Sequence, residues 1–375
     1  MNLALSPEQE LLREAARGSL ARHRTIEAAH GALDGGSLPD LWPTARDAGW
    51  PGLLIAEDQG GAGLGAFDAM LVAQECGRVL AGVPLIGLLP ATAILDAAGA
   101  EGLEAVAAGE RPVAWLPARP PSDGEGWTVE PPRGKSRARA PRATRDGDGV
   151  VLTGAAAFVP DAPHADLLVV VGAAEDGAPV AAAVEASADG VTVEPVTSYD
   201  PTRALAHVTL DGARGTALDA EAETLERAWH LMQALIAAES VGAVEATLEM
   251  AVAYARERFT FGRAIGSYQA VKHGLTEVLR RLENARSLLY YAGWAWESGP
   301  AEFALAASAA RSAAGSALDH AARQNIATHG GIGATWEHDA PLFFRRAQLT
   351  RRLVGGTAGA TDRVATEVLA AAPAA

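Results

Sequence analysis

The sequence predicts a mostly helical protein with a central β domain. Apolar residues recur at helical spacing up to about residue 110, short β-type runs follow, and helical periodicity returns after about residue 217. At 375 residues the chain is long enough for two or three packed units. We therefore expect an N-terminal helical domain over 1–110, a β-sandwich or barrel over 111–217, and a C-terminal four-helix bundle over 218–375.

The N-terminal domain opens with a helix start signal. In the segment Ser6-Pro7-Glu8-Gln9, a serine precedes a proline at the first helical position. Gln9 lies three residues after Ser6, where its side chain can bond back to the serine backbone. Glycine-rich turns at 35–36 and 60–65 then divide the periodic sequence into several helices.

The β domain is predicted from five runs rich in β-branched residues and separated by turn residues. These runs are VVLTG (150–154), AFVP (157–160), DLLVVVG (166–172), GVTVEPV (190–196) and AHVTLDG (206–212). The segment 119–149 is rich in Pro, Gly, Arg and Asp, so we expect a long mobile excursion there. Its basic run, GKSRARAPRATR, is expected to be a solvated loop rather than a phosphate site.

The C-terminal domain is predicted from four long periodic stretches. They cover residues 222–257, 266–297, 301–330 and 341–370. No strand followed by a GxGxxG turn and a helix is found, and βαβ units do not alternate along the chain. These features exclude a Rossmann domain.

Composition excludes several classes of function. The net charge of −15 argues against a nucleic-acid partner, because binding a polyanion requires a basic surface. Cys76 is the only cysteine, which excludes a disulfide framework and disfavours a cysteine-based metal site. No apolar run approaches the roughly 20 residues that span a bilayer, and no secretory signal is apparent. A cytoplasmic location is therefore expected.

Three motifs carry a resemblance to the acyl-CoA dehydrogenase family. Residues 254–273, YARERFTFGRAIGSYQAVKH, resemble a family signature in which one helix ends and the next begins. Residues 329–346, HGGIGATWEHDAPLFFRR, resemble the family's glycine turn and the arginine-rich helix after it. Residues 42–82 resemble the N-terminal domain, and 152–171 resemble part of the β domain. The resemblance covers nearly the whole chain.

The resemblance implies a tetrameric flavoprotein with FAD bound between subunits. The flavin ring would lie in one subunit, and a neighbouring subunit would hold the adenosine-pyrophosphate arm. The implied reaction removes a proton from the α carbon of an acyl-CoA and passes a hydride from the β carbon to flavin N5. It requires a carboxylate base, donors for the thioester oxygen and a well-placed flavin.

The base positions that the resemblance implies contain no carboxylate. The family's Tyr-Glu-Gly-Thr turn corresponds to Val354-Gly355-Gly356-Thr357, and the alternative position on the first bundle helix corresponds to Met232. Glu239 is the nearest candidate, but it lies about 10 Å further along the helix, so we favour a structural helix contact. Glu245 and Glu249 are no better placed. We predict no catalytic residue in this chain.

The ring-binding strands also depart from the family pattern. A Trp-Ile-Thr or Trp-Ile-Ser strand corresponds to Phe158-Val159-Pro160, and proline offers neither an N–H nor a hydroxyl to the flavin. A Thr-Glu-Pro segment corresponds to Trp115-Leu116-Pro117, which supplies little polar contact.

The arm-binding side is better preserved. The resemblance implies these cofactor-binding residues: Arg258, Thr260, Phe261, Ile265, Tyr268, Gly330 and Gly331. A guanidinium fork at Arg258 suits a pyrophosphate, and the glycines allow the backbone to approach it closely. A surface ion pair with Glu257 or a helix C-cap is the alternative for Arg258, and Ala327 replaces a family glutamine.

Other polar residues have structural explanations. His273 and His329 lack a second ligand at metal spacing, so no metal site is predicted. The cluster 336–339 could orient Arg345 and Arg346 at a helix contact, and Arg203 is expected to be structural.

The preserved arm site and the missing base together suggest a non-catalytic subunit. The resemblance supplies a precedent, because actinobacterial acyl-CoA dehydrogenases acting on steroid side-chain CoA esters contain two each of two different subunits. We therefore expect a second acyl-CoA dehydrogenase subunit as partner, an acyl-CoA substrate and FAD as cofactor. A self-sufficient enzyme with a displaced base and a flavin-free acyl-CoA-binding or scaffold protein are the alternatives.

Overall fold

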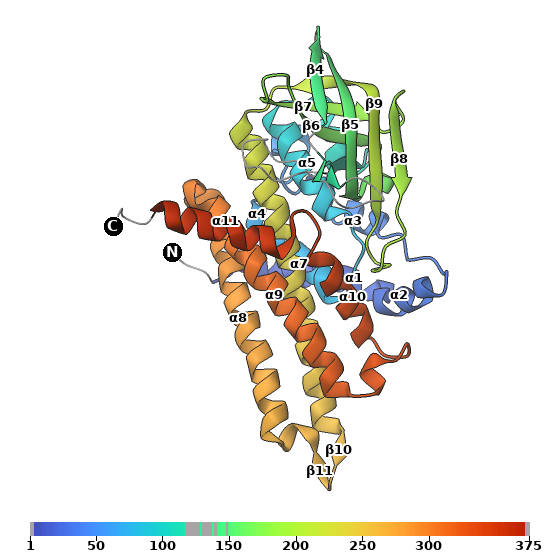
Figure 1. The fold of residues 1–375 in the computed structure, drawn as a ribbon, viewed down its shortest axis with the longest axis vertical. Helices are drawn as coiled ribbons and strands as arrows, with labels where there is room; N and C mark the ends of the chain where they lie inside the picture. Colours follow the sequence, from blue (N-terminus) through green and yellow to red (C-terminus); the bar gives the residue numbers. More distant parts are fainter. Residues whose placement is uncertain (1–3, 117–127, 130–136, 139–140, 148, 372–375) are drawn as a thin grey trace.

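The computed structural model describes residues 4–116, 128–129, 137–138, 141–147 and 149–371. Its elements follow the expected order of helices, strands and helices (Figure 1). The N-terminal helices are α1 (Pro7–Leu20), α2 (Thr25–Leu33), α3 (Trp42–Asp47), α4 (Ala66–Arg78), α5 (Leu85–Ala97) and α6 (Leu103–Ala107). None of the helices in these ranges is long and apolar enough to cross a membrane.

The central strands come next along the chain. They are β1 (Val113–Trp115), β2 (Thr128–Val129), β3 (Arg137–Ala138), β4 (Arg142–Asp146), β5 (Gly149–Pro160), β6 (Leu167–Ala173), β7 (Pro179–Glu185), β8 (Val191–Pro195) and β9 (Leu205–Leu218). The C-terminal elements are α7 (Ala222–Glu257), β10 (Phe259–Thr260), β11 (Arg263–Ala264), α8 (Gln269–Ser298), α9 (Phe303–His329), α10 (Ala340–Thr350) and α11 (Gly356–Ala371).

The predicted helix start at residue 6 is confirmed. The backbone N–H of Gln9 donates to Ser6 Oγ at 3.2 Å, and the N–H of Ser6 donates to Gln9 Oε1 at 3.0 Å. This reciprocal capping box satisfies backbone donors at the start of α1 that have no partner within the helix.

The main sheet closes into a small barrel. Its strand order is β1-β6-β4-β5-β9-β7, β6 also pairs with β7 to close the ring, and β8 lies beside β9. Strand β5 runs unbroken from Gly149 to Pro160, although the sequence indicated two separate runs. Register shifts interrupt its pairing with β9 between Leu152 and Thr153 and between Ala156 and Val159.

Two strands of the barrel were not predicted. Strand β7 (PVAAAVE) is rich in alanine, which has low strand propensity, and pairing with β6 and β9 fixes it as a strand. The expected excursion over 119–149 is wrong for Arg142–Asp146, which pairs with β5 as β4. Most of the remaining excursion lies outside the described residues. So does part of its basic run, and the end of that run, Arg142–Arg145, lies in β4 rather than in the expected solvated loop.

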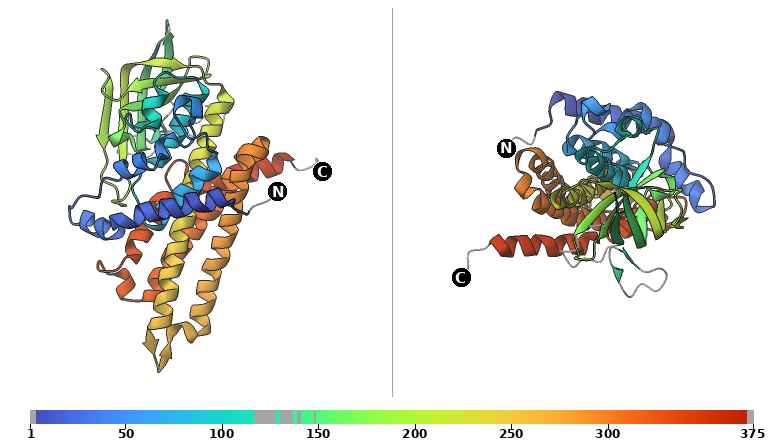
Figure 2. Two further views of the ribbon diagram at one scale, coloured as in Figure 1. Left: turned by 180° about the vertical axis from the view of Figure 1, so that it is seen from behind. Right: turned by 90° about the horizontal axis from the view of Figure 1, so that it is seen from above.

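Strand β6 is buried on both faces, which explains its continuous apolar sequence. Val169 and Val171 pack in the core shared with the helices, and Leu168 and Val170 pack inside the barrel. Helix α5 contacts β1 and β6 on the helical side (Figure 2). One hydrophobic core therefore joins both helical parts to the barrel, and the division at residues 110 and 217 remains a prediction.

Helices α4 and α7 pack closely because glycines face the opposite backbone. A Cβ at Gly77 would clash with the carbonyl of Glu239, and a Cβ at Gly242 would clash with the carbonyl of Gln74. The expected helix over 341–370 is broken into α10 and α11. Positive φ angles of 52° at Val354 and 78° at Gly355 end the helical path there.

Candidate functional site

A two-stranded hairpin joins α7 to α8 at the free end of the bundle (Figure 1). Arg258 is the C-cap of α7: its N–H donates to Tyr254 O at 2.8 Å, and its carbonyl accepts from Ile265 N at 2.8 Å. The Tyr268 hydroxyl donates to Thr260 O at 3.1 Å and fastens the hairpin to the start of α8. The first five predicted arm residues therefore lie on one hairpin unit.

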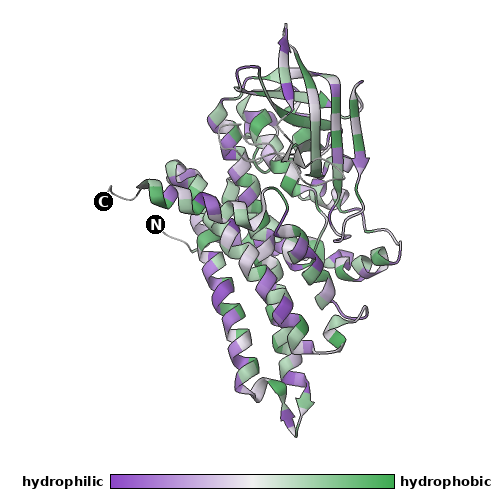
Figure 3. Cartoon of the chain, viewed as in Figure 1, coloured by the Kyte–Doolittle hydropathy of each residue, from purple (hydrophilic) through white to green (hydrophobic). Residues whose placement is uncertain are grey.

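The hairpin presents its side chains outward. Phe261 is 94% exposed at its tip and Phe259 is 63% exposed, and Figure 3 shows hydrophobic residues on this part of the chain. The exposed guanidinium of Arg258 has no hydrogen bond or ion pair with another described residue, so the alternative ion pair with Glu257 does not form. The backbone of Arg258 caps the C-terminus of α7, so its side chain is not used for capping and can bind a ligand.

The glycine turn after α9 lies at the same end of the bundle. Gly330 has a φ of 66°, and its N–H donates to Ile326 O at 3.0 Å as α9 ends. A Cβ at Gly330 or Gly331 would have no atom within 4 Å, so the backbone here faces open space. The turn can therefore be approached closely by a ligand.

Three rings in mutual contact connect the end of α7, just before the hairpin, to the glycine turn. The ring of Tyr254 lies 4.3 Å from that of His329, which lies 4.1 Å from that of His338. His329 Nδ1 lies 2.8 Å from Asn325 O, so it is an ordinary hydrogen-bonded histidine. Burial, and next the neighbouring His329, lower the pKa of His338.

Sequence reasoning missed Tyr254 and His338. Tyr254 lies one helical turn before Arg258, and this spacing could have indicated it. Within the described ranges, no group of three or more His, Cys, Asp or Glu side chains is placed to hold a metal ion.

The arm end of the bundle fits a pyrophosphate-bearing group. An exposed guanidinium fork, an exposed aromatic ring and two unobstructed glycines converge there from two connections of the bundle. Charge-assisted hydrogen bonds from arginine and backbone N–H groups are the interactions that phosphates use.

A hydrogen bond links the segments that carry the two expected base positions. Gln233 Nε2 donates to Val354 O at 3.1 Å, which places the neighbours of Met232 and Gly355 in direct contact. Met232 is 0% exposed, and Gly355 has no side chain. Neither position offers a group that accepts a proton.

Glu239 belongs to a buried ion network rather than to a reaction site. Its Oε2 accepts from Arg203 and also from Arg346 Nη1 at 3.4 Å. Arg346 Nε donates to Asp200 at 2.6 Å, and Arg346 Nη2 donates to the Thr202 hydroxyl at 2.6 Å. The network connects the loop before β9 to α7 and α10, as the structural interpretation of Glu239 and Arg203 requires.

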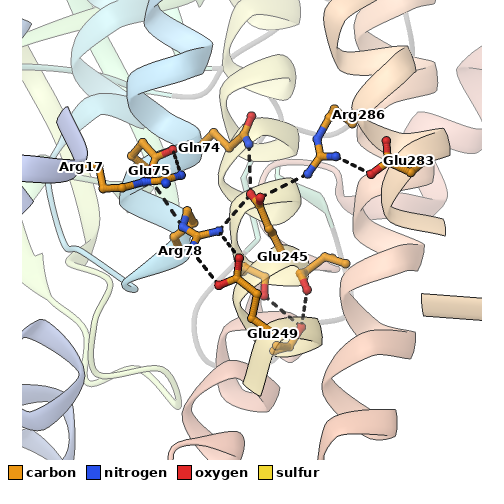
Figure 4. A network of polar contacts seen from close by, with 11 residues as sticks. Arg17, Gln74, Glu75, Arg78, Glu245, Glu249, Glu283 and Arg286 are labelled. Atoms are coloured by element: carbon orange, nitrogen blue, oxygen red, sulfur yellow. Dashed lines mark hydrogen bonds and ion pairs between the residues drawn. The ribbon is translucent and has the colours of Figure 1, made fainter. Parts of the chain in front are cut away.

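Glu245 and Glu249 are also held by arginines (Figure 4). Arg78 Nη1 lies 3.1 Å from Glu245, and Arg78 Nη2 lies 2.8 Å from Glu249. Arg286 approaches Glu245 from α8 at 3.5 Å. These carboxylates therefore connect α4, α7 and α8.

The ring side of the expected flavin site does not fit a flavin in the family's manner. Phe158 has a φ of 56°, and its N–H donates to His207 Nδ1 at 3.4 Å. Pro160 has no N–H to offer. Trp115 is fully buried against Trp229, with ring centroids 6.3 Å apart, and Pro117 lies outside the described residues.

The cluster at 336–339 orients only one of the two arginines expected there. The Arg345 guanidinium lies 5.3 Å from the Trp336 ring and 4.2 Å from the Tyr199 ring. Arg346 is held instead by the buried ion network, through Asp200 and Glu239.

The chain folds as helices, then a barrel, then a helical bundle, and an exposed arginine and an open glycine turn suited to a phosphate lie at the free end of the bundle. This is the fold of a flavin-dependent acyl-CoA enzyme. The acyl-CoA dehydrogenase N-terminal domain matches residues 6–105, and the C-terminal domain of the same family matches residues 223–369. The chain belongs to the acyl-CoA dehydrogenase family, whose members are oxidoreductases that act on acyl-CoA with FAD as cofactor.

Individual relatives support this assignment over the full length. The chain is 30% identical to acyl-CoA dehydrogenase IpdE2 of Mycolicibacterium smegmatis, over 97% of this chain and 100% of that protein. The structure of a variant of the Tcur3481-Tcur3483 steroid ACAD aligns with a TM-score of 0.85 and 26% identity, over 97% of this chain and 98% of that chain. The ChsE4-ChsE5 complex from Mycobacterium tuberculosis aligns with a TM-score of 0.84 and 25% identity, over the full length of both chains.

Proposed function

We propose that this chain is the non-catalytic subunit of a two-plus-two acyl-CoA dehydrogenase that desaturates an acyl-CoA between its α and β carbons. It contributes the FAD arm site, and a second type of subunit contributes the flavin-ring pocket and the base. The observation that carries the proposal is the absence of a carboxylate at both base positions. Neither Met232 nor Gly355 supplies one, and their sequence neighbours Gln233 and Val354 are in contact.

The residues of this chain then bind and orient the cofactor. Arg258 pairs with the pyrophosphate, and the open backbone at Gly330 and Gly331 approaches it. Phe261 and the hairpin beside Tyr268 provide apolar contact for the adenosine, and Ile265 and Thr260 complete the same unit. The bound FAD supplies the hydride acceptor, and its ring lies in the partner.

The relatives support the two-subunit arrangement. Two aligned structures carry paired names, Tcur3481-Tcur3483 and ChsE4-ChsE5, and the first is titled a steroid ACAD. We extend both features to this chain: a different subunit as partner and a bulky CoA ester, such as a steroid side-chain ester, as substrate. A self-sufficient enzyme is disfavoured, because arginines hold Glu239, Glu245 and Glu249.

Co-expression tests the proposal directly. The chain is produced alone and together with a candidate partner, an acyl-CoA dehydrogenase chain from the same organism that carries the catalytic glutamate, and native mass spectrometry and visible spectra are recorded for both. We expect a colourless product alone and a yellow complex with two copies of each chain. A yellow chain that oxidises acyl-CoA by itself would contradict the proposal, and a stable colourless chain that captures no partner would support the flavin-free alternative.

A further inference from the structure

A cavity of about 870 Å³ lies between the N-terminal helices and the barrel, away from the arm site. Its walls come from α2 and the segment 36–42, the turn after α4, and the loop 196–204 before β9. No residue of the hairpin, the glycine turn or the base positions lines it. Its volume is within the range of small-molecule sites, roughly 300–1,000 Å³.

The part of the cavity wall formed by α2, the following segment and the turn after α4 is largely apolar. Leu33, Leu38, Leu41 and Trp42 line it from α2 and the following segment, and Leu80 lines it from the turn after α4. Such walls favour an apolar ligand body, because burial removes its surface from water.

The wall formed by the barrel contains a buried carboxylate with unused hydrogen-bonding capacity. Asp161 is 4% exposed, and of its two carboxylate oxygens only Oδ2 is hydrogen bonded within the described part of the chain, accepting from Gly87 N at 2.7 Å. Arg203 lines the same wall, but its guanidinium nitrogens are enclosed by protein: Nη2 pairs with Glu239, and a water-sized group does not reach Nε or Nη1. Buried donors and acceptors rarely remain unpaired, because each one costs about 1–3 kcal/mol.

The charge balance of this wall indicates the kind of polar group that fits. Asp161 and the ion network contain three carboxylates, Asp161, Asp200 and Glu239, against the two guanidiniums of Arg203 and Arg346. A further anion would meet this excess negative charge. A neutral group that donates a hydrogen bond would match the free oxygen of Asp161.

We propose that this cavity binds a neutral, apolar molecule that carries a hydroxyl group. The hydroxyl donates to Asp161, and the apolar body lies against Leu38, Leu41 and Trp42. None of the arm-site residues or base positions lines this cavity, so the inference does not rest on the proposed function.

Calorimetric titration of the full chain with octanol tests the site. Octyl methyl ether, which accepts but cannot donate, and octanoate, which is anionic, serve as comparison probes. We expect saturable binding of octanol to one site, about tenfold tighter than either comparison probe. Equal binding of all three probes, or no saturable binding of octanol, would overturn the proposal.

Three variants locate the binding. Ala165→Trp places a large ring in a lining position and should abolish octanol binding, whereas Ala178→Trp, in the exposed turn between β6 and β7, should not change it. In Asp161→Asn the amide oxygen stays with Gly87 N–H, so an amide donor replaces the acceptor that faces the ligand; octanol should bind about tenfold more weakly, without a loss for the ether. Wild-type affinity in both Ala165→Trp and Asp161→Asn would refute the site, and thermal unfolding of each variant shows that it is folded.

Discussion

The ring of Tyr254 lies 4.3 Å from the ring of His329, at an angle of 33°, and joins the end of α7 to the end of α9. Arg258 lies one helical turn beyond Tyr254, and Gly330 directly follows His329. This contact therefore links the two halves of the proposed arm site. His338 extends the stack to the segment before α10.

Tyr254→Ala should loosen this junction. The variant loses an aromatic pair and part of a half-buried side chain, so we expect a loss of about 2 kcal/mol in the free energy of unfolding. The co-expressed complex should retain several-fold less FAD, measured by the ratio of flavin to protein absorbance. Tyr254→Phe keeps the ring and should behave as the wild type. An unchanged flavin content in Tyr254→Ala would show that the stack does not position the arm site.

Arg258→Ala should remove flavin without destabilising the chain. The side chain is exposed, so its loss should change the free energy of unfolding by less than about 0.5 kcal/mol. Flavin content of the complex should fall strongly, and Arg258→Lys should restore it only in part, because lysine lacks the bidentate fork. Arg22→Ala, at an exposed position in the short turn after α1, is the control. Full flavin occupancy in Arg258→Ala would contradict the assigned role.

Glu239→Gln distinguishes a structural carboxylate from a base. Removing the charge leaves two buried guanidiniums short of a partner, so we expect a loss of about 3 kcal/mol in denaturant unfolding. Glu249→Gln on the same helix removes an exposed pairing and should cost less than about 1 kcal/mol. Turnover of the complex, corrected for folded protein, should survive Glu239→Gln. Loss of turnover with unchanged stability would instead identify a base.

Asp161 should give the chain a distinct pH dependence. Burial raises the pKa of Asp161 from 3.8 to about 6 despite the nearby Arg203. Between pH 3.8 and about 6 the folded state therefore binds more protons than the unfolded state. The stability that protonated Asp161 contributes is fully present below about pH 4 and is lost as the pH rises through 6. The loss amounts to about 3 kcal/mol. Asp161→Asn should remove this dependence, measured as the difference between the two unfolding curves from pH 4 to 7. Parallel curves would contradict the raised pKa.

The order of the domains could be predicted from the sequence, because the spacing of apolar residues is helical in the first and last parts of the chain and β-type in the middle. Helix α7 was expected over 222–257 and begins and ends at these residues, since its apolar positions repeat without glycine or proline breaks near its ends. The break between α10 and α11 was missed, because apolar residues continue at helical spacing through it. Only the backbone angles at Val354 and Gly355 end the helix there.

The sequence predicts the residues of the candidate site that lie close together along the chain, but it does not predict the contacts between distant segments. The hairpin residues follow one another in sequence, so their grouping on one unit needed no knowledge of the fold. The contacts Tyr254–His329 and Gln233–Val354 join segments far apart in the chain and depend on helix packing. Asp161 could not be singled out from its neighbours in the sequence, because its burial beside Gly87 follows from the position of α5.

Gly355→Glu tests whether the missing base is the only defect of this chain. A glutamate there has a φ of 78°, which should cost about 1 kcal/mol in stability, and Gly355→Ala is the control for that strain. We expect no oxidation of acyl-CoA by the isolated variant, because Phe158 and Pro160 still lack the flavin contacts of the family. The assay follows bleaching of the flavin band without oxygen, in the presence of added FAD and octanoyl-CoA. Bleaching by Gly355→Glu but not by Gly355→Ala would show that a complete ring site exists in this chain and that only the carboxylate was absent.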